Sequence, residues 1–335
     1  MRFPAVLVTG AAGFIGAALA DALMEQGHSV IGIDDLNDYY SVQLKRDRLT
    51  RLIERHKDRF TFLELDFADA AALEAALAPQ AFDAIVHLGA QAGVRYSLEN
   101  PLAYVRSNLT GHVNMLELAR ARQIAHFVYA SSSSVYGGNE KLPFAVEDRT
   151  DHPVSLYAAT KRADELMSET YAHLFRIPQT GLRFFTVYGP WGRPDMALWR
   201  FTQRLLDGRP IEVYNQGAMQ RDFTYIDDII AGVIACLQRP PADDGASKPG
   251  GSTKPHALYN IGNNRPEPLM RLIEVLEQAC GRKAELLLLP MQPGDVPATY
   301  ADITDIARDT GYAPSTPIEV GVPRFVDWYR AYTGV

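Results

Sequence analysis

Short apolar runs alternate with amphipathic stretches along the first half of the chain. The runs predict buried β-strands at residues 6–8, 29–33, 60–65, 84–88, 127–130 and 181–185. Apolar residues at helical spacing follow the first five runs, at residues 14–26, 41–56, 73–77, 102–123 and 154–175. Strands that alternate with helices in this way form parallel sheets with helices on both faces. The pattern therefore predicts an α/β fold built on a Rossmann-type doubly wound parallel sheet.

The pattern loosens after about residue 186, where prolines and glycines become frequent. Two further helices and a strand are expected at residues 269–280, 318–332 and 285–289. A tract rich in Pro, Gly, Ser and Lys at residues 240–255 is typical of an exposed loop. We therefore expect a first domain of residues 1–185, joined by part of residues 222–262, and a smaller C-terminal α/β lobe formed mainly by residues 186–335.

Three glycines, Gly10, Gly13 and Gly16, lie between the first expected strand and the first helix. Glycines at this spacing allow a tight turn, a close approach of backbone to phosphate, and a helix N-terminus that faces the anion. Asp34 follows the second strand at about the position expected for a carboxylate that binds the adenosine ribose. A 2′-phosphate would be repelled there, so the sequence predicts NAD rather than NADP. An ordinary strand-turn-helix, with glycines that serve only the turn, is the alternative.

The composition narrows the class of protein. The 335 residues are 47% hydrophobic and carry a formal net charge of −7, and no dense run of Lys and Arg could follow a nucleic-acid backbone. The basic residues of the helix at 41–56, including Lys45 and Arg48, are interpreted as a solvated face. Cys236 and Cys280 lack the spacing of a metal or redox site, so neither a metal nor a disulfide is expected. Because no apolar run reaches about 18 residues, we expect a cytoplasmic protein without a membrane segment.

Tyr157 and Lys161 are four residues apart within the expected helix at 154–175. Both side chains therefore lie on one face and can contact one small molecule. The preceding strand runs into four serines at residues 131–134. A lysine ammonium and an oxidised nicotinamide would favour the phenolate of Tyr157, which could then act as a base near neutral pH. Taken alone, the serine run is equally typical of a polar turn.

Further motifs carry a resemblance that spans essentially the whole chain. They are LNDYY at residues 36–40, QAGVRYS at 91–97, SSSSVYG at 131–137, LRFFTVYGP at 182–190, WGRPDM at 191–196, RDFTYIDD at 221–228 and QPGDVPA at 292–298. With the glycine motif and Tyr-x-x-x-Lys, they make the chain similar to the extended short-chain dehydrogenase/reductase superfamily, and within it to UDP-glucuronate 4-epimerases. The resemblance implies tightly bound NAD and reversible C4 epimerisation of UDP-glucuronate to UDP-galacturonate through a transient 4-keto intermediate.

The resemblance also implies roles for single residues. Tyr157 takes and returns a proton, Lys161 binds the nicotinamide ribose, and Ser132 is the hydroxyl partner of the tyrosine. The implied cofactor contacts are Gly10, Gly13, Phe14, Ile15, Gly16, Asp34, Asn37, Asp66, Phe67, Leu88, Gly89, Ala90, Asn108, Tyr157, Lys161 and Phe184. The implied contacts with the UDP-sugar, mostly in the C-terminal lobe, are Arg95, Ser132, Ser133, Ser134, Thr186, Arg193, Leu198, Val213, Tyr214, Arg221 and Asp295.

Ser133 and Ser134 occupy the two places where dehydratases and decarboxylases of the superfamily carry an acidic residue. Serine hydroxyls, together with Thr186, could hold the sugar carboxylate by charge-assisted hydrogen bonds and so prevent loss of carbon dioxide. Thr186 and Thr299 also differ from the Asn and the large Tyr of UDP-galactose 4-epimerases. These departures favour a uronate substrate.

The substrate diphosphate requires cationic partners. Arg221 matches a diphosphate-binding arginine of related epimerases, whereas Gln292 stands where a second arginine is expected. We therefore expect Arg193 or Arg95 to substitute for it, although each arginine taken alone is also consistent with a surface ion pair.

Other functions remain as alternatives. The nearest is a UDP-glucose or UDP-N-acetylhexosamine 4-epimerase, followed by a UDP-sugar dehydratase or decarboxylase. A non-enzymatic NAD-sensing protein would be expected to have lost part of the catalytic set, and Ser132, Tyr157 and Lys161 are all present. Relatives pair the helices that correspond to residues 102–123 and 154–175, so a homodimer is expected by analogy.

Overall fold

A seven-stranded parallel sheet forms the centre of the molecule, in the strand order β10-β6-β5-β4-β1-β2-β3. The computed structural model describes residues 3–292 and 296–335. The strands are β1 (Ala5–Thr9), β2 (Ser29–Asp34), β3 (Phe60–Glu64), β4 (Ala84–His87), β5 (His126–Ser132), β6 (Gln179–Phe184) and β10 (His256–Ile261). The predicted doubly wound α/β fold is therefore confirmed. The chain order reverses between β1 and β4, and α/β sheets bind their ligands at such a switch point.

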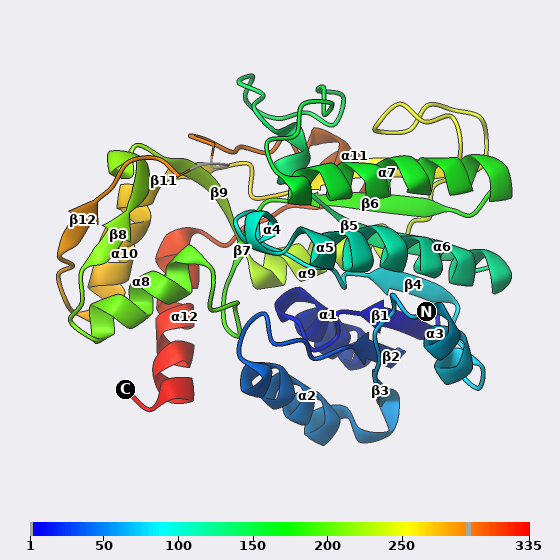
Figure 1. The fold of residues 1–335 in the computed structure, drawn as a ribbon, viewed down its shortest axis with the longest axis horizontal. Helices are drawn as coiled ribbons and strands as arrows, with labels where there is room; N and C mark the ends of the chain where they lie inside the picture. Colours follow the sequence, from blue (N-terminus) through cyan, green and yellow to red (C-terminus); the bar gives the residue numbers. More distant parts are fainter. Residues whose placement is uncertain (1–2, 293–295) are drawn as a thin grey trace.

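Helices cover both faces of this sheet, as Figure 1 shows. Those of one layer are α1 (Phe14–Glu25), α2 (Val42–His56) and α9 (Ile226–Leu237), and those of the other are α3 (Ala70–Leu77), α6 (Gly111–Ala121) and α7 (Leu156–Phe175). Along β1, Val6 and Val8 enter one core cluster and Leu7 the other. A strand with both faces buried explains the continuous apolar runs of the sequence.

The helix expected at residues 102–123 is divided into three parts. Short α5 (Pro101–Tyr104) leads into a π-helical segment, η2 (Val105–Thr110), before α6 begins. Within the π segment, the Asn108 side chain accepts a bond from Gln91 N (2.8 Å) and donates to Gln91 O (3.1 Å) and Thr160 Oγ1 (3.0 Å). The wider turn thus coincides with a buried side chain that holds the loop after β4, and π segments often lie at functional sites.

A smaller lobe lies beside the sheet, on the left of Figure 1. It contains β7 (Thr186–Tyr188), β9 (Gln220–Tyr225) and β11 (Pro266–Pro268) in one sheet, β8 (Ile211–Val213) and β12 (Leu286–Leu288) in another, and the helices α8 (Ala197–Leu206), α10 (Leu269–Cys280) and α12 (Ile318–Thr333). The remaining short elements are α4 (Tyr96–Glu99), α11 (Thr304–Thr310), η1 (Lys57–Arg59), η3 (Ser133–Tyr136) and η4 (Tyr214–Gly217). Several of these strands have three residues, which is too short for a periodicity to be recognised in the sequence.

The chain returns to the large sheet after entering the smaller lobe. Helix α9 packs against α1, and β10 pairs with β6 at the sheet edge. The loop at 240–255 is partly exposed and is tied to α7, because Ser252 Oγ donates to Glu169 at 2.8 Å. The division into two domains at residue 185 stays a prediction. Among residues 3–292 and 296–335, no helix combines the length and the apolar character needed to cross a bilayer.

The predicted solvated face of α2 is wrong for two of its residues. Arg48 is fully buried and donates to Trp191 O (2.6 Å) and Ala12 O (3.0 Å). Lys45 is also buried, with its ammonium 3.7 Å from the Asp34 carboxylate. The sequence could not reveal this, because these acceptors come from segments brought together only by the fold.

Candidate active site

The glycine motif forms a turn at the carboxyl end of β1. Gly10 has φ +69°, a conformation that favours glycine, and Gly13 N donates to Gly10 O at 2.9 Å. A Cβ on Gly16 would lie 2.0 Å from Gly10 O, so the first turn of α1 packs on this loop without room for a side chain. The loop and the N-terminus of α1 therefore form a backbone cradle that fits a pyrophosphate.

Asp34 ends β2 beside this cradle. Its carboxylate accepts bonds from Leu36 N (2.9 Å) and Ala12 N (3.2 Å) and faces Lys45. Burial raises the pKa of Asp34, while Lys45 and the two backbone donors oppose that rise. Asp34 is therefore held in place by backbone donors beside the cradle and by Lys45. The sequence analysis had interpreted Lys45 as a solvated residue.

A cavity of about 240 Å³ extends from the glycine loop across the switch point of the sheet. Most of the expected cofactor residues line it, namely Gly10, Gly13, Phe14, Ile15, Gly16, Asp34, Asn37, Phe67, Leu88, Gly89, Ala90, Tyr157, Lys161 and Phe184. Asp66 and Asn108 are not among its lining residues. Asp66 is paired with Arg106 at 2.6 Å, and Asn108 instead holds the backbone of Gln91, which does line the cavity.

Tyr157 and Lys161 project from the first turns of α7. Ser155 begins this helix as its N-cap, with Oγ accepting from Ala158 N at 3.1 Å. Lys161 is buried, and its Nζ donates to Ala130 O (2.9 Å) and to Asp164 Oδ2 (3.2 Å). An ammonium has three N–H donors, so two anchored bonds fix its position and leave one for a ligand.

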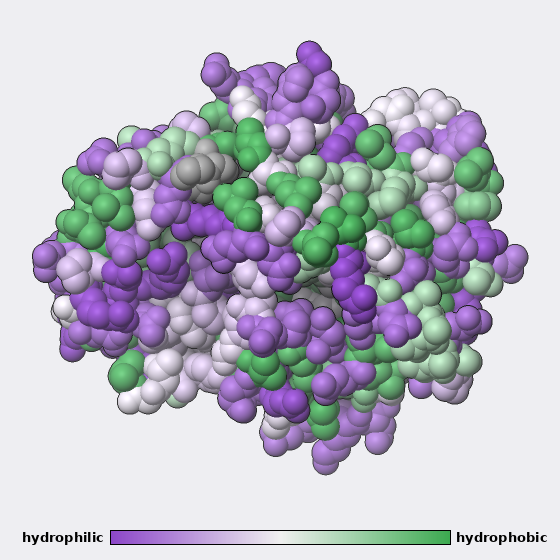
Figure 2. Space-filling view, viewed as in Figure 1, coloured by the Kyte–Doolittle hydropathy of each residue, from purple (hydrophilic) through white to green (hydrophobic). Residues whose placement is uncertain are grey.

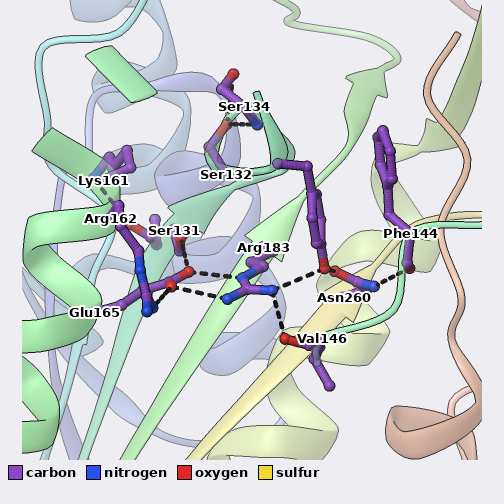
Figure 3. Close-up of polar contacts among 12 residues, drawn as sticks. Ser131, Ser132, Ser134, Phe144, Val146, Lys161, Arg162, Glu165, Arg183 and Asn260 are labelled. Carbon is purple, nitrogen blue, oxygen red and sulfur yellow. Dashed lines mark hydrogen bonds and ion pairs between the residues drawn. The ribbon is translucent and has the colours of Figure 1, made fainter. Parts of the chain in front are cut away.

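The serine run continues β5 into the short helix η3, as Figure 3 shows. Ser132 Oγ donates to Ser134 Oγ at 3.1 Å and accepts from Ser134 N at 3.1 Å. Ser132 lines the first cavity together with Tyr157 and Lys161. The predicted trio from β5 and α7 is therefore brought to one cavity.

A second cavity of about 730 Å³ lies between the sheet and the smaller lobe. The expected substrate residues on its wall are Arg95, Ser132, Ser133, Ser134, Thr186, Arg193, Tyr214 and Arg221. Leu198 and Val213 belong to the apolar core instead and are not on the wall of either cavity. Asp295 lies outside the described residues.

Arg193 is held by Asp195 on the same loop, with Nη2 2.6 Å and Nε 3.0 Å from the carboxylate. Tyr39 OH donates to the same carboxylate at 3.2 Å. Burial raises the pKa of the Asp195 carboxyl, but Arg193 and the hydrogen bonds outweigh it and hold the pKa below its ordinary value. Burial and the nearby Asp195 raise the pKa of Tyr39 to about 12. Arg193 is thus a charged and oriented donor at the wall of both cavities.

The two cavities share part of their walls. Ser132, Tyr157, Phe184 and Arg193 line both of them. A ligand in one cavity can therefore meet a ligand in the other at the tyrosine. This junction is the strongest evidence in the structure for a reaction between two bound molecules.

Several lining residues were not among the expected contacts, and they include Lys45 in the first cavity, Tyr39 in both, and Arg200 in the second. Tyr39 lies in the LNDYY motif that carried the resemblance, so that motif was the available signal. Lys45 gave none, because it lies on a helix whose basic residues look like a solvated face, and Arg200 lies on α8, a helix that the sequence analysis did not predict.

Known proteins match the chain over almost all of its length. The model of the NAD dependent epimerase/dehydratase family matches residues 6–262. A probable UDP-glucuronate 4-epimerase of Rhizobium meliloti (strain 1021) is 48% identical over 98% of this chain and 99% of its own. UDP-glucuronate 4-epimerase 1 of Arabidopsis thaliana is 46% identical over 98% of this chain and 77% of its own.

Among solved structures, the UDP-glucuronic acid 4-epimerase of Bacillus cereus in complex with UDP-glucuronic acid and NAD superimposes with a TM-score of 0.87. It is 31% identical and covers 98% of this chain and 99% of that one. The similarity therefore extends over almost the whole of both chains. The chain therefore belongs to the NAD dependent epimerase/dehydratase family.

Proposed function

We propose that this protein interconverts UDP-glucuronate and UDP-galacturonate by epimerisation at C4, with tightly bound NAD. The observation that carries the proposal is the junction of the two cavities at Ser132 and Tyr157, with serines rather than an acid at positions 133 and 134. The relatives and the solved structure named above are similar over the full length of the chain.

The first cavity holds NAD in this proposal. The cradle at Gly10, Gly13 and Gly16 fits its pyrophosphate because no side chain fills that space. Asp34 and Lys45 lie where the adenosine ribose is expected, and a second negative charge there would meet the Asp34 carboxylate. The chemistry that bound NAD would supply here is a hydride acceptor for C4 of the sugar and, after the sugar has turned, a hydride donor to its opposite face.

Tyr157 acts as the proton acceptor and donor for the C4 oxygen. Tyr157 lines both cavities, and Lys161 lies about one helical turn after it on α7. The bonds of Lys161 to Ala130 and Asp164 keep its ammonium in position, where it can stabilise negative charge at the tyrosine oxygen during the proton transfer. Ser132 bridges the C4 hydroxyl and the tyrosine oxygen.

The carboxylate of the sugar lies against Ser133, Ser134 and Thr186 on the wall of the second cavity. Oxidation at C4 gives a β-keto acid, which loses carbon dioxide when the bond to the carboxylate aligns with the carbonyl π system. Hydrogen bonds to the carboxylate restrict that alignment and stabilise its charge. The absence of an acid at positions 133 and 134 removes a proton donor for elimination.

The diphosphate of UDP is bound by arginines from separate elements. Arg221 belongs to β9, Arg193 to the loop before α8, and Arg95 to the loop before α4, and all three line the second cavity. A planar guanidinium suits phosphate oxygens because it donates two parallel hydrogen bonds. Arg193, already oriented by Asp195, is the strongest replacement for the arginine that Gln292 does not supply.

Incubation of the purified protein with UDP-glucuronate, followed by separation of the products, tests the proposal. We expect a mixture of UDP-glucuronate and UDP-galacturonate with no added oxidant. UDP-pentose as the main product would make the protein a decarboxylase. Unchanged UDP-glucuronate beside converted UDP-glucose would assign it to neutral sugars.

We also propose that two copies associate through α4, α5, η2 and α7. Exposed apolar side chains gather there, namely Leu98, Leu102, Val105 and Leu166, and Figure 2 has hydrophobic residues over this part of the molecule. An apolar patch on contiguous helices favours an isologous interface. Leu102→Glu should shift the protein to monomers in sedimentation, whereas Leu287→Glu, on the exposed strand β12, should not. A monomeric parent protein would contradict this interface.

Two buried free thiols, Cys236 and Cys280, are consistent with a cytoplasmic location, which we keep as a further proposal. Fractionation of cells that express the protein tests it, and recovery outside the cytoplasm would contradict it.

A further inference from the structure

The serine segment from Ser131 to Tyr136 is attached at both ends to one buried ion pair. The pair joins Glu165 on α7 to Arg183 on β6, and Figure 3 shows it below the serines. Arg183 Nε lies 2.8 Å from Glu165 Oε1, and Nη2 lies 2.9 Å from Oε2. This is a two-point contact between planar groups, which fixes their relative orientation.

Both members of the pair are almost completely buried. Burial raises the pKa of Glu165, but Arg183 and the hydrogen bonds from Arg183 and Ser131 outweigh it and hold the pKa below its ordinary value. Burial lowers the pKa of Arg183, but Glu165 and Tyr136 outweigh it and hold that pKa above its ordinary value. Both groups are therefore charged, and the pair is a fixed point from which other groups can be positioned.

The first end of the serine segment binds the carboxylate. Ser131 Oγ donates to Glu165 Oε1 at 2.6 Å, one residue before Ser132. Glu165 lies one helical turn after Lys161 on α7, so this bond also sets the distance between the serines and the catalytic helix.

The other end of the segment binds the guanidinium. Tyr136 OH accepts from Arg183 Nη1 at 2.9 Å and donates to Asn260 Oδ1 at 2.6 Å. Burial raises the pKa of Tyr136 to about 12, so the hydroxyl stays neutral and can make both bonds. Asn260 Nδ2 in turn donates to Phe144 O (2.7 Å) and Asp302 O (3.1 Å), which ties the segment to the loop after Thr299.

We propose that Glu165 and Arg183 are positioning residues that clamp the serine segment at Ser131 and Tyr136, and so keep the sugar carboxylate from being lost as carbon dioxide. The inference rests on the proposed function. It adds an explanation of why the product would be UDP-galacturonate rather than UDP-pentose. Ser133 and Ser134 can restrict the carboxylate only if their own backbone does not move, and the clamp holds that backbone relative to Tyr157 and Lys161.

The competing reaction is a decarboxylation of the 4-keto acid. The bond between C5 and the carboxyl carbon breaks, carbon dioxide leaves, and the electron pair forms an enolate with the C4 carbonyl. A proton from solvent then adds at C5 to give a 4-keto pentose, which becomes UDP-pentose when the hydride returns to C4. A looser serine segment lets the breaking bond align with the carbonyl more often.

Two substitutions detach one end of the segment each and leave the ion pair intact. In Tyr136→Phe, Arg183 Nη1 keeps its bond to Val146 O at 3.0 Å, and in Ser131→Ala, Glu165 Oε1 keeps Arg183 Nε. Tyr129→Phe is the matched control, because it removes another fully buried hydroxyl on the same face of β5, one that is bound to His256 Nε2 at 2.8 Å rather than to the serine segment. The measurement is the ratio of UDP-pentose to UDP-galacturonate formed from UDP-glucuronate, with bound NAD and melting temperature recorded for each protein.

Each substitution at the clamp should raise this ratio about fivefold or more, and the control should leave it near that of the wild type. Slower epimerisation with an unchanged ratio would reduce the pair to a structural role and overturn the proposal. An equal rise in Tyr129→Phe would overturn it too, because loosening of the core in general would then be the cause. A wild type that leaves UDP-glucuronate untouched would refute the proposed function and the clamp together, whereas an active wild type with indifferent variants would refute the clamp alone.

Discussion

The walls of the two cavities are built from different parts of the polypeptide. The first has a backbone cradle and glycines at the ends of β1 and β4, such as Gly10 and Gly89. The second carries long charged side chains that are paired with one another, as Arg204 is with Glu212 at 2.7 Å and Arg193 with Asp195. The cofactor side should therefore be sensitive to added volume, and the substrate side to lost charge.

Tyr157 belongs to both walls, so its loss should have the largest effect. Tyr157→Phe keeps the ring and removes the hydroxyl, and we expect turnover of UDP-glucuronate to fall about a thousandfold. Bound NAD should be unchanged, because the cradle is not altered. Undiminished turnover, measured with the NAD content in the same preparation, would contradict the assignment of the proton acceptor.

A methyl group in the cradle tests the sensitivity of the cofactor side to volume. In Gly16→Ala the new Cβ would meet the backbone oxygen of Gly10, so we expect loss of bound NAD and a destabilisation of about 1–3 kcal/mol. Gly138→Ala is the control, since the nearest atom to its Cβ is Val154 Cγ1 at 3.9 Å. Thermal unfolding and the NAD released on denaturation measure both effects. Equal behaviour of the two variants would show that the cradle tolerates volume.

Removal of a cation tests the substrate side. Arg221→Ala should raise KM for UDP-glucuronate about tenfold to a hundredfold, because a charge-assisted contact with phosphate is lost. The NAD content should stay constant, which separates the two walls. If Arg221→Ala lost NAD but kept the KM for UDP-glucuronate, Arg221 would belong to the cofactor side and not to the substrate side.

The smallest effect is expected for Asp164, the partner of Lys161. Burial raises its pKa from 3.8 to about 7, with Lys161 opposing the rise. Between these two values the folded protein holds a proton that the unfolded chain has released, so this group makes stability fall as pH rises.

In Asp164→Asn that titration is absent, and the amide oxygen can still accept from Lys161. The melting temperature of the wild type relative to this variant should therefore decrease by about a few degrees from pH 5 to pH 8. A difference that does not change with pH would show that Asp164 is ionised throughout.

Local sequence patterns were sufficient to predict the backbone cradle and the acid beside it in the first cavity. The glycine spacing, the apolar run before it and the acid after β2 are all read from neighbouring residues, and each was found in the expected place. The helical spacing of Tyr157 and Lys161 was likewise sufficient to put both on one wall. Asp66 and Asn108 were also expected to contact the cofactor, but neither lines the cavity, so their contact stays a prediction.

Predictions that depended on contacts between residues far apart in the sequence were the ones that failed. Lys45 and Arg48 appeared to be solvated because their partners come from β2 and from the loop after β7. The resemblance implied that Leu198 contacts the substrate, yet on α8 its side chain belongs to the apolar core. The three-residue strands of the smaller lobe gave no periodicity at all.

The sequence by itself determined the class of fold, the backbone cradle and the placement of Tyr157 and Lys161 on one wall, because these depend on the order and spacing of neighbouring residues. Only the tertiary structure decided which charges pair in the interior and how the serine segment is held. Glu165 and Arg183 are 18 residues apart in the chain and on different elements, so their contact exists only after α7 packs on the sheet. Buried charges must find partners wherever the fold supplies them, and spacing along a sequence does not specify that partner.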